Sequence, residues 1–549
     1  MGKKKENSFL MQGTILAAAA IITKIIGLAY RIPLTNILGE EGNGYYGVVF
    51  QVYNLALMLT SYSMPMAVSK LVSERLAKRQ YKNAQRVFRS AMTIAVIAGG
   101  AATLIVFFGA GFIGSKILKM ELSVYALRTL SPCILIVAFL GVFRGYFQGH
   151  RTMIPTAVSQ ILEQIVNAVF SIIGAYFLFK IGLGMAEGAK SESYGAALSA
   201  AGGTIGTVAG ALTALVFLVL LYTAYTKIVR QRVRRDRTRR VESNKKIYKV
   251  LLLTLAPVIL SSTLSNITNI LDQGLFTNVM ASLGYTEKEY TSLLGLLNGQ
   301  YDTMVGIPFS ISTALASSFM PSLVAAIQVG TRREIHQKID LITRFNMMII
   351  IPCAAGFIAL ARPIMDLLFF TQNNEIPAML LRIGAFSVIL LCLSSVTNAA
   401  LQGMDKMMQP VKNAAIALAV HTVALIIMLA VFKWNVYGVV VSKIVFAGVI
   451  CLLNSRDLKR ACGYVQEKKK TFLIPAIAAV IMGAAAMLVY KVFALFCPGA
   501  VATIIAILAA VIVYCVSLVM LGGVSEQELL EMPKGTMIIK LLKKVHLLR

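Results

Sequence analysis

A row of polar side chains interrupts one otherwise apolar stretch of the sequence, residues 153–180. The row consists of Gln160, Glu163, Gln164 and Asn167, at positions i, i+3, i+4 and i+7. Residues at this spacing share one face of an α-helix, and a polar face in an apolar environment has to meet water or other polar groups. Amide and carboxylate groups in this arrangement predict contacts with the polar part of a ligand.

Two basic residues, Lys24 and Arg31, lie seven positions apart in another apolar stretch, residues 10–38. An ionised side chain at the centre of a bilayer costs about 2.5–3.5 kcal/mol on insertion scales, so such residues usually face a cavity or a partner. We expect Lys24 and Arg31 to line a cavity and to bind negative charge. Glu163 is a candidate partner of Lys24, and a purely structural ion pair between the two is the alternative.

Polar groups in the second half of the chain are more scattered. Lys443 lies deep in an apolar stretch, and Asn266 and Asp272 belong to a weaker polar row in residues 249–280. Asp302 lies further along the chain. We predict Asn266 and Lys443 as ligand-binding residues, and Asp272 and Asp302 as candidates for ion coupling.

Basic groups outnumber acidic groups within the apolar stretches. The basic residues are Lys24, Arg31, Lys70, Arg128, Arg362, Arg382, Lys443 and Lys491, and the acidic residues are Glu163, Asp272, Asp302 and Asp366. Four of the basic residues lie nearer the helix ends, where a long side chain can extend to the membrane surface. The excess of positive charge favours an anionic passenger over a cationic one.

The composition predicts that these residues are carried by a polytopic membrane protein. Of the 549 residues, 57% are hydrophobic and 14% are charged, and the mean hydropathy is +0.75. Soluble domains contain about 25% charged residues. Since a spanning helix needs about 20 apolar residues, the sequence predicts an all-α fold with fourteen transmembrane helices. They lie near residues 10–38, 43–73, 87–115, 122–147, 153–180, 193–226, 249–280, 290–328, 343–370, 377–401, 410–432, 434–454, 471–493 and 499–522.

The distribution of Lys and Arg predicts the orientation of these helices. The connections on one side of the membrane are rich in Lys and Arg. Those on the other side hold only Lys116, Lys119, Lys180, Lys190, Lys288 and Lys433. Cytoplasmic connections carry the excess of positive charge, so both termini are predicted to be cytoplasmic. The net charge of +29 is then explained without nucleic acid, and the basic segment 227–240 is expected to contact anionic membrane lipid.

An internal repeat predicts two parallel six-helix bundles followed by two extra helices. GYFQGHRTMIPTAVSQ (145–160) matches AALQGMDKMMQPVKNA (399–414), and two other matches occur in the same order. Parallel repeats place a cavity between the halves. The predicted parts are an N-terminal bundle (1–226), a basic linker (227–248), a C-terminal bundle (249–455), a basic loop (456–470), helices 13–14 (471–522) and an amphipathic cytoplasmic tail (523–549).

Several motifs for other chemistry are absent or out of context. GNGYYG (42–47) has the G-x-G-x-x-G pattern, but no strand precedes it, so we expect a tight turn between the first two spans rather than a nucleotide site. The sequence contains no GxxxxGK[ST] motif, and its seven Cys form no CxxC pair. We therefore expect neither an ATP site, a metal nor another cofactor, so that a membrane potential or an ion gradient would drive transport.

Four segments resemble a known family: ITKIIGLAYRIPL, ILGEEGNGYYGVVFQVYNL, MPMAVSKLVSE and RGYFQGHRTMIPTAVSQILEQIVN. They are similar to the polysaccharide-biosynthesis, stage V sporulation protein B-like branch of the multidrug/oligosaccharidyl-lipid/polysaccharide exporter superfamily, which is related to MurJ-type lipid II flippases. The resemblance covers nearly the whole chain. It implies two six-helix bundles plus two helices that hold a lipid tail, working by alternating access in the bacterial plasma membrane.

The resemblance also implies a function without catalysis. It implies export of an undecaprenyl-pyrophosphate-linked sugar, most simply the peptidoglycan precursor lipid II, with Lys24 matching a cavity-lining basic position of the family. Span eight lacks the basic residue that better-known members carry, which leaves another lipid-linked oligosaccharide as an alternative. A drug or cation exporter is the third possibility. We expect a monomer, with cell-wall synthesis enzymes as candidate partners.

Overall fold

The computed structural model describes residues 2–185, 189–236, 238, 241–329, 331–370 and 374–523, which form helices joined by short turns and connections. No strand occurs among these residues. The chain divides into two compact units, residues 1–299 (unit 1) and 300–549 (unit 2). The predicted boundaries of the two bundles and of the loops between them remain predictions.

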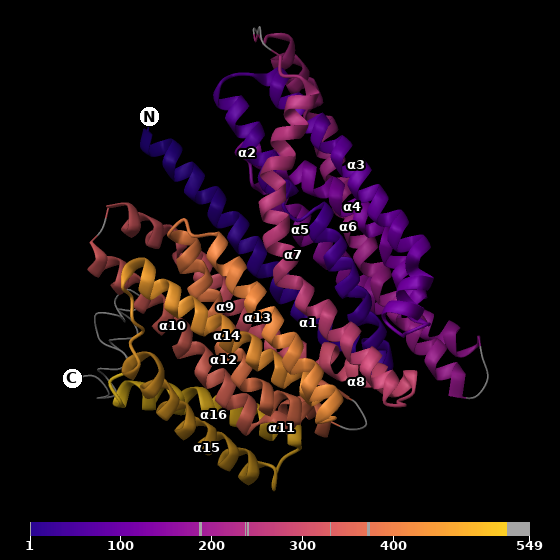
Figure 1. Ribbon diagram of the computed structural model, residues 1–549, viewed down its shortest axis with the longest axis vertical. Coiled ribbons are helices and arrows are strands. Elements are labelled where there is room, and N and C mark those ends of the chain that lie inside the picture. Colours follow the sequence, from indigo (N-terminus) through magenta and orange to yellow (C-terminus); the bar gives the residue numbers. More distant parts are fainter. Residues whose placement is uncertain are drawn as a thin grey trace. The chain divides into compact units, whose positions relative to one another are not determined.

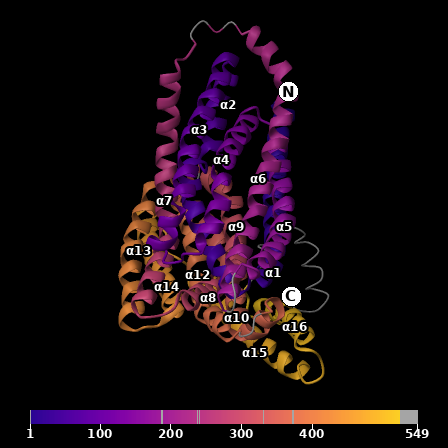
Figure 2. The same ribbon diagram turned by 90° about the vertical axis from the view of Figure 1, so that its right-hand side faces the viewer.

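Unit 1 is built from eight helices in its described part (Figure 1). They are α1 (Gly2–Thr60), α2 (Met64–Ala77), α3 (Tyr81–Phe112), α4 (Ser123–Gly149), α5 (Ile154–Leu183), α6 (Ala189–Arg234), α7 (Asn244–Ser282) and α8 (Glu287–Gly295). Two π-helical turns, η1 (Ile113–Ile117) and η2 (Leu296–Tyr301), extend α3 and α8. Helix α4 contacts both α3 and α6, and α3 in turn contacts α7, so α3 and α4 lie between α7 and α6 (Figure 2).

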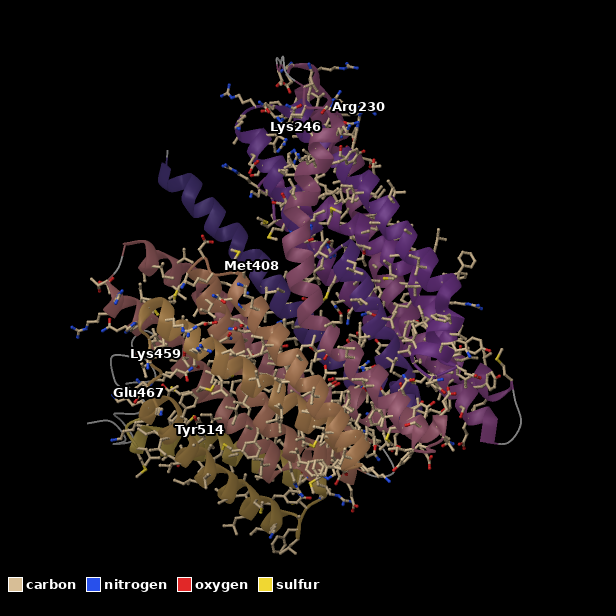
Figure 3. All side chains as sticks on the ribbon, in the orientation of Figure 1. Arg230, Lys246, Met408, Lys459, Glu467 and Tyr514 are labelled. Carbon is tan, nitrogen blue, oxygen red and sulfur yellow. The ribbon has the colours of Figure 1, made fainter. Side chains whose placement is uncertain are left out.

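Unit 2 contains the remaining helices. They are α9 (Asp302–Val329), α10 (Arg332–Ala359), α11 (Ala361–Leu368), α12 (Glu375–Gly403), α13 (Met408–Ile426), α14 (Asn435–Cys462), α15 (Ile474–Phe493) and α16 (Gly499–Met520), with the π-helical turns η3 (Ile427–Val431) and η4 (Lys469–Leu473). Helix α12 packs against α9, α10 and α14, and the α15–α16 pair packs against α10. The Tyr514 hydroxyl, labelled in Figure 3, donates a 2.7 Å hydrogen bond to the carbonyl oxygen of Met348 and so fastens α16 to α10.

Within the described residues, eleven helical segments are long and apolar enough to cross a membrane. Helices α7 and α9, which have 39 and 28 residues, also exceed the length of about 20 residues that a spanning helix needs. The protein is therefore a multi-pass membrane protein with an all-helical fold, as predicted. The count of fourteen spans and the cytoplasmic location of both termini stay predictions, and the predicted amphipathic tail lies outside the described residues from residue 524 onward.

The predicted turn at GNGYYG is wrong, because residues 42–47 are helical. The chain bends three residues earlier, at Gly39, whose φ of 66° lies in the left-handed region that glycine adopts without strain. Gly44 and Gly47 instead lie where a side chain would collide with Thr291 and Asn298. These glycines therefore allow α1 to pack closely against α8 and η2, a role that their spacing alone does not distinguish from a turn.

Glycines also explain the close packing of α5 on α6. A side chain at Gly174 would collide with the backbone of Gly202, and the reverse is also true. Further along α6, Gly206 and Gly210 lie against the backbone of α5 at Asn167 and Glu163. Small residues allow two membrane helices to approach within backbone contact. This contact fixes how the polar row of α5 is presented.

The repeated Gln-Gly segment has the same backbone structure in both units. Arg151 and Asp405, each three residues after the glutamine, both have a φ of 60°. The Arg151 N–H donates to the Gln148 carbonyl at 2.9 Å, and the Asp405 N–H donates to the Gln402 carbonyl at 3.1 Å. The sequence match between these positions, 254 residues apart, is therefore also a match of structure.

The basic linker is tied to unit 1 by its acidic residues. The Lys82 N–H donates a 2.7 Å hydrogen bond to Asp236, and Arg75 forms a 2.7 Å ion pair with Glu242. These contacts hold the connection from α6 to α7 against the turn between α2 and α3. Arg230 near the end of α6 and Lys246 at the start of α7 lie at the same end of unit 1 (Figure 3).

Candidate functional site

Glu163, on the polar face of α5, forms an ion pair with Arg144 of α4. The Arg144 Nη2 to Glu163 Oε2 distance is 2.6 Å, and Arg144 Nε donates a 3.0 Å hydrogen bond to the Ser159 hydroxyl. The expected pairing of Glu163 with Lys24 is therefore wrong. Arg144 is a site residue that the sequence analysis did not single out, although the predicted span 122–147 contains it, and α4 holds it inside the helix. The proximity of the Gln-Gly turn, which reverses the chain between α4 and α5, was the signal that could have placed the two residues together.

The two glutamines of the polar row have buried oxygens that accept no hydrogen bond from any described residue. These atoms are Gln160 Oε1 and Gln164 Oε1. A buried acceptor without a donor costs about 1–3 kcal/mol, and such an atom in a native structure calls for an explanation, such as a bound water or ligand. The pair is thus ready to accept hydrogen bonds from hydroxyl or amide groups.

Asn167 is the most buried residue of the row and has several partners. Its amide Nδ2 donates to the Tyr30 hydroxyl of α1 at 3.1 Å, and its Oδ1 accepts from Ser171 at 2.8 Å and from Thr207 of α6 at 3.3 Å. These bonds join α5 to α1 and α6. The predicted ligand-binding role of Asn167 therefore coexists with a structural one.

The two predicted basic residues of α1 have different surroundings. Lys24 is exposed in unit 1. Arg31 is half-buried, and its guanidinium carbon lies 4.5 Å from the centre of the Tyr46 ring, which is a cation–π geometry. The Tyr46 ring therefore holds Arg31 in place. Because the ring is uncharged, this contact does not neutralise the positive charge of Arg31.

In unit 2, Lys443 of α14 pairs with Asp302 at the start of α9. The Lys443 Nζ to Asp302 Oδ1 distance is 3.2 Å, and the two side chains are 18% and 35% exposed. The ammonium also lies 6.0 Å from the centre of the Tyr301 ring. The Lys443 charge therefore already compensates the carboxylate predicted for ion coupling. Asp272 of α7 is buried in unit 1, and the side chain of Asn266 lies outside the described part.

Unit 2 has an amide network, joined by the Asp457 carboxylate, where unit 1 has the Arg144 ion pair. Asn398 and Asn413, which lie 254 residues after Arg144 and Ser159, are joined through Asn454 of α14. Asn413 Nδ2 donates to Asn454 Oδ1 at 2.9 Å, and Asn454 Nδ2 donates to Asn398 Oδ1 at 2.8 Å. The positions equivalent to Gln160 and Gln164 are Ala414 and Leu418. Polar groups able to take a ligand at these positions are thus concentrated in unit 1.

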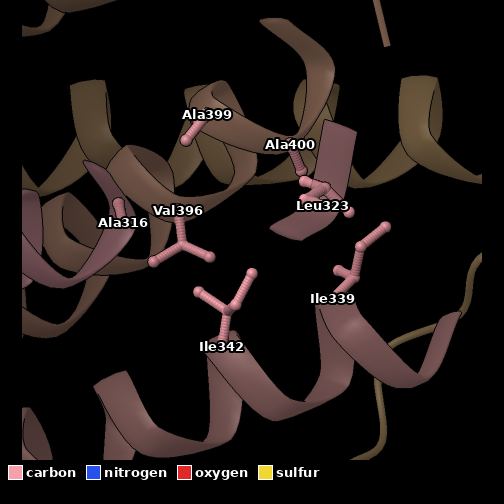
Figure 4. Close-up of a pocket in the computed structure, with 7 residues that line it drawn as sticks. All are labelled: Ala316, Leu323, Ile339, Ile342, Val396, Ala399 and Ala400. Carbon is pink, nitrogen blue, oxygen red and sulfur yellow. The ribbon is translucent and has the colours of Figure 1, made fainter. Parts of the chain in front are cut away.

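An apolar pocket in unit 2 is unsuited to a polar ligand (Figure 4). It lies between α9, α10 and α12. The lining residues are Ala316, Leu323, Ile339, Ile342, Val396, Ala399 and Ala400. All carry alkyl side chains, so the pocket offers no group that recognises charge or hydroxyls.

Comparisons with known proteins place the chain among membrane transporters. It is 25% identical over 506 residues to lipid II flippase MurJ of Bacillus subtilis (strain 168), covering 89% of this chain and 90% of that protein. Stage V sporulation protein B of the same organism is 23% identical over 344 residues, which are 62% of this chain and 63% of that protein.

Solved structures share the fold at low sequence identity. Lipid II flippase MurJ in an inward closed conformation matches with a TM-score of 0.68 and 16% identity, covering 92% of this chain and 98% of that one. An inward-facing multidrug resistance MATE transporter of the MOP superfamily matches with a TM-score of 0.63 and 16% identity, covering 80% of this chain and 95% of that one. These likenesses agree with an all-helical polytopic membrane fold.

The named relatives are flippases, transporters and sporulation proteins rather than catalytic enzymes, which confirms that the protein is a transporter of the flippase or exporter type. The profile of a family described as "Polysaccharide biosynthesis protein" matches residues 9–327, which is more than half of the chain. The chain therefore belongs to the polysaccharide biosynthesis protein family of membrane transporters.

Proposed function

We propose that the protein is a flippase for an undecaprenyl-pyrophosphate-linked sugar, and that this substrate is the peptidoglycan precursor lipid II. The observation that carries the proposal is the polar set of unit 1, in which Arg144, Arg31 and the row on α5 lie among apolar helices. Cations bind the diphosphate, and the amide oxygens of Gln160 and Gln164 accept hydrogen bonds from the sugar or its peptide. The similarity to lipid II flippase MurJ over 89% of this chain supports this choice of substrate.

The energy for transport comes from an existing gradient. An inside-negative potential moves an anion outward, with about 2.3 kcal/mol per charge for each 100 mV. The potential therefore pushes the negatively charged diphosphate of the substrate outward, which is the direction of the proposed export. Ion coupling through Asp272 or Asp302 would reset the empty carrier.

A flipping assay tests the proposal directly. The purified full chain is reconstituted in proteoliposomes that contain fluorescent lipid II on one leaflet, and the rate at which the label reaches the other leaflet is measured. We expect a rate above that of empty liposomes, which rises when an inside-negative potential is imposed. A rate equal to that of empty liposomes would remove the proposal. Complementation of a flippase-depleted strain by the wild type, and its failure with Lys24→Ala, is the matching cellular test.

Another lipid-linked oligosaccharide is the second candidate, because the matched family is described by polysaccharide biosynthesis. The same assay separates the two when it is run with lipid-linked precursors of teichoic acid or capsule. Drug or cation export is disfavoured by the excess of basic over acidic groups within the apolar stretches. Unchanged drug susceptibility in cells that express the protein would agree with this.

A further inference from the structure

The Arg144–Glu163 ion pair of unit 1 is partly open rather than sealed in the core. The two side chains are 14% and 25% exposed. A guanidinium has five N–H donors, and the ion pair with Glu163 and the hydrogen bond to Ser159 engage only two of its nitrogens. Donors therefore remain on Arg144 for a second oxygen-rich group. Phosphate binds a guanidinium in the same bidentate manner as a carboxylate does, so it can take the place of Glu163.

Gln160 and Gln164 supply the opposite kind of group on the same helix. Their buried oxygens accept no hydrogen bond from the described residues. The two residues flank Glu163 on one face of α5, one helical turn apart. The face thus offers a cation for phosphate and, beside it, acceptors for hydroxyl or amide donors.

The network of unit 2, in which Asn413 also donates to the Asp457 carboxylate at 2.8 Å, shows that clamping these helices does not require a cation. Asn398 and Asn413 hold the equivalent helix ends through Asn454, and these amide groups have hydrogen-bond partners. Ala414 and Leu418 stand where unit 1 has its two glutamines. A purely structural clamp would need neither the ion pair nor the unpaired glutamine oxygens. The difference between the units therefore points to a ligand.

We propose that Arg144, Gln160 and Gln164 form a subsite for a diphosphate-linked sugar, and that Glu163 occupies Arg144 only while this subsite is empty. The phosphate displaces the Glu163 carboxylate from the guanidinium, and donors of the adjoining sugar bond to the glutamine oxygens. Glu163 is thus a competitor of the ligand rather than a direct contact. This inference rests on the proposed function, because it identifies where that substrate is first bound.

Binding measurements on the full chain in nanodiscs test the inference. The probe is a water-soluble farnesyl-diphosphate-linked disaccharide, and the affinity is measured by microscale thermophoresis. Arg144→Gln should weaken binding about tenfold or more, because it removes hydrogen bonds to a charged group. Glu163→Gln should tighten binding by about threefold to tenfold, because the competing charge is gone. Lys180→Gln removes a positive charge at the exposed far end of the same helix and should leave the affinity within about twofold of wild type.

The opposite signs for Arg144→Gln and Glu163→Gln distinguish a ligand site from a structural clamp. If the pair only clamps α4 to α5, both changes weaken binding and lower the thermal unfolding temperature together, which would overturn the inference. Gln160→Leu and Gln164→Leu provide an independent readout. They should weaken the disaccharide probe but leave farnesyl diphosphate, which lacks the sugar, unchanged. Equal effects on the two probes would also overturn the inference.

The wild-type protein separates this inference from the proposed function. If the wild type flips lipid II and binds the probe, but all four variants bind as it does, only the subsite is wrong. If the wild type neither binds the probe nor flips lipid II, the proposed function and the subsite are both overturned.

Discussion

The ends of α4 and α5 in unit 1 and the ends of α12 and α13 in unit 2 share a turn but differ in chemistry. Arg151 and Asp405 adopt the same left-handed conformation after the same Gln-Gly pair. One helical turn or more away from that turn, unit 1 has the ion pair of Arg144 and Glu163, while unit 2 has the amide network of Asn454, which Asp457 joins as an acceptor. The comparison teaches that local hydrogen bonds determine the backbone conformation of the repeated turn. The side chains one or two helical turns away can differ between the units without changing that conformation.

Making unit 1 resemble unit 2 should have the largest effect. The double change Arg144→Asn and Ser159→Asn places the amides found at 398 and 413 at the equivalent positions and leaves Glu163 without its cation. We expect a folded protein whose rate of lipid II flipping is lowered about tenfold or more, because the cation for phosphate is lost. Flipping in proteoliposomes and the thermal unfolding temperature are measured together. A variant that flips at the wild-type rate would show that the charge has no part in transport.

Breaking the network of unit 2 should affect stability instead. Asn454→Leu removes one hydrogen-bond partner each from Asn413, Thr397 and Asn398, although Asn413 keeps its bond to Asp457. We expect the free energy of unfolding to fall by about 2–4 kcal/mol, because each unsatisfied buried group costs about 1–3 kcal/mol. Flipping per folded molecule should stay near the wild-type value.

The control for that change is Leu452→Ala, two residues away on α14 and exposed. It should leave the unfolding temperature almost unchanged. If Asn454→Leu lowers the flipping rate by a larger factor than it lowers the amount of folded protein, a purely structural role of Asn454 would be contradicted.

The Lys443–Asp302 pair offers a smaller test of how unit 2 uses charge. Lys443→Gln and Asp302→Asn are made singly and together, and the coupling free energy is obtained from thermal unfolding of all four proteins. We expect a coupling of about 0.5–1 kcal/mol, because both side chains are partly exposed. A coupling of zero would mean that each residue serves another partner, as ion coupling at Asp302 would require.

The smallest expected effect concerns Glu467, which caps the start of η4 at the end of the basic loop 456–470. Burial alone would raise the pKa of the Glu467 carboxyl. Hydrogen bonds from the N–H groups of Lys470 and Thr471 outweigh this effect and hold the pKa below its usual value. The carboxylate accepts from Lys470 N at 2.8 Å and from Thr471 N at 2.9 Å at the start of η4 (Figure 3 labels Glu467). A lowered carboxyl pKa stabilises the folded state at pH values above 4.5, the pKa of the group in the unfolded chain. This contribution is lost as the pH falls through the pKa of the folded state.

Glu467→Gln should therefore lower the unfolding free energy at neutral pH by about 0.5–1 kcal/mol, as expected of a partly exposed cap. The difference from wild type should shrink as the pH is lowered below 4.5. It is measured by thermal unfolding over a pH series. A difference that grows on acidification would contradict the assigned sign.

The sequence was sufficient to predict the helices and several polar positions, but not their partners. The row on α5 was predicted because helical periodicity is a local property, and it is helical in the structure. The partner of Glu163 was missed because Arg144 lies on another helix, and contacts between helices do not follow from the periodicity of either one. GNGYYG was misread because glycines at a tight turn and glycines at a close helix contact leave the same pattern in a sequence.

What the sequence by itself determined is which segments enter the membrane and which of their side chains are too polar for lipid, because hydropathy and periodicity depend on neighbours along the chain. Only the tertiary structure decided that Arg144 faces Glu163, that Lys443 faces Asp302, and that the glutamines of α5 have buried oxygens with no donor among the described residues. The physical reason is that pairing energies depend on distances of a few ångströms between helices. The packing of α4, α5 and α6 through their glycines and turns sets those distances, and no single helix contains that information.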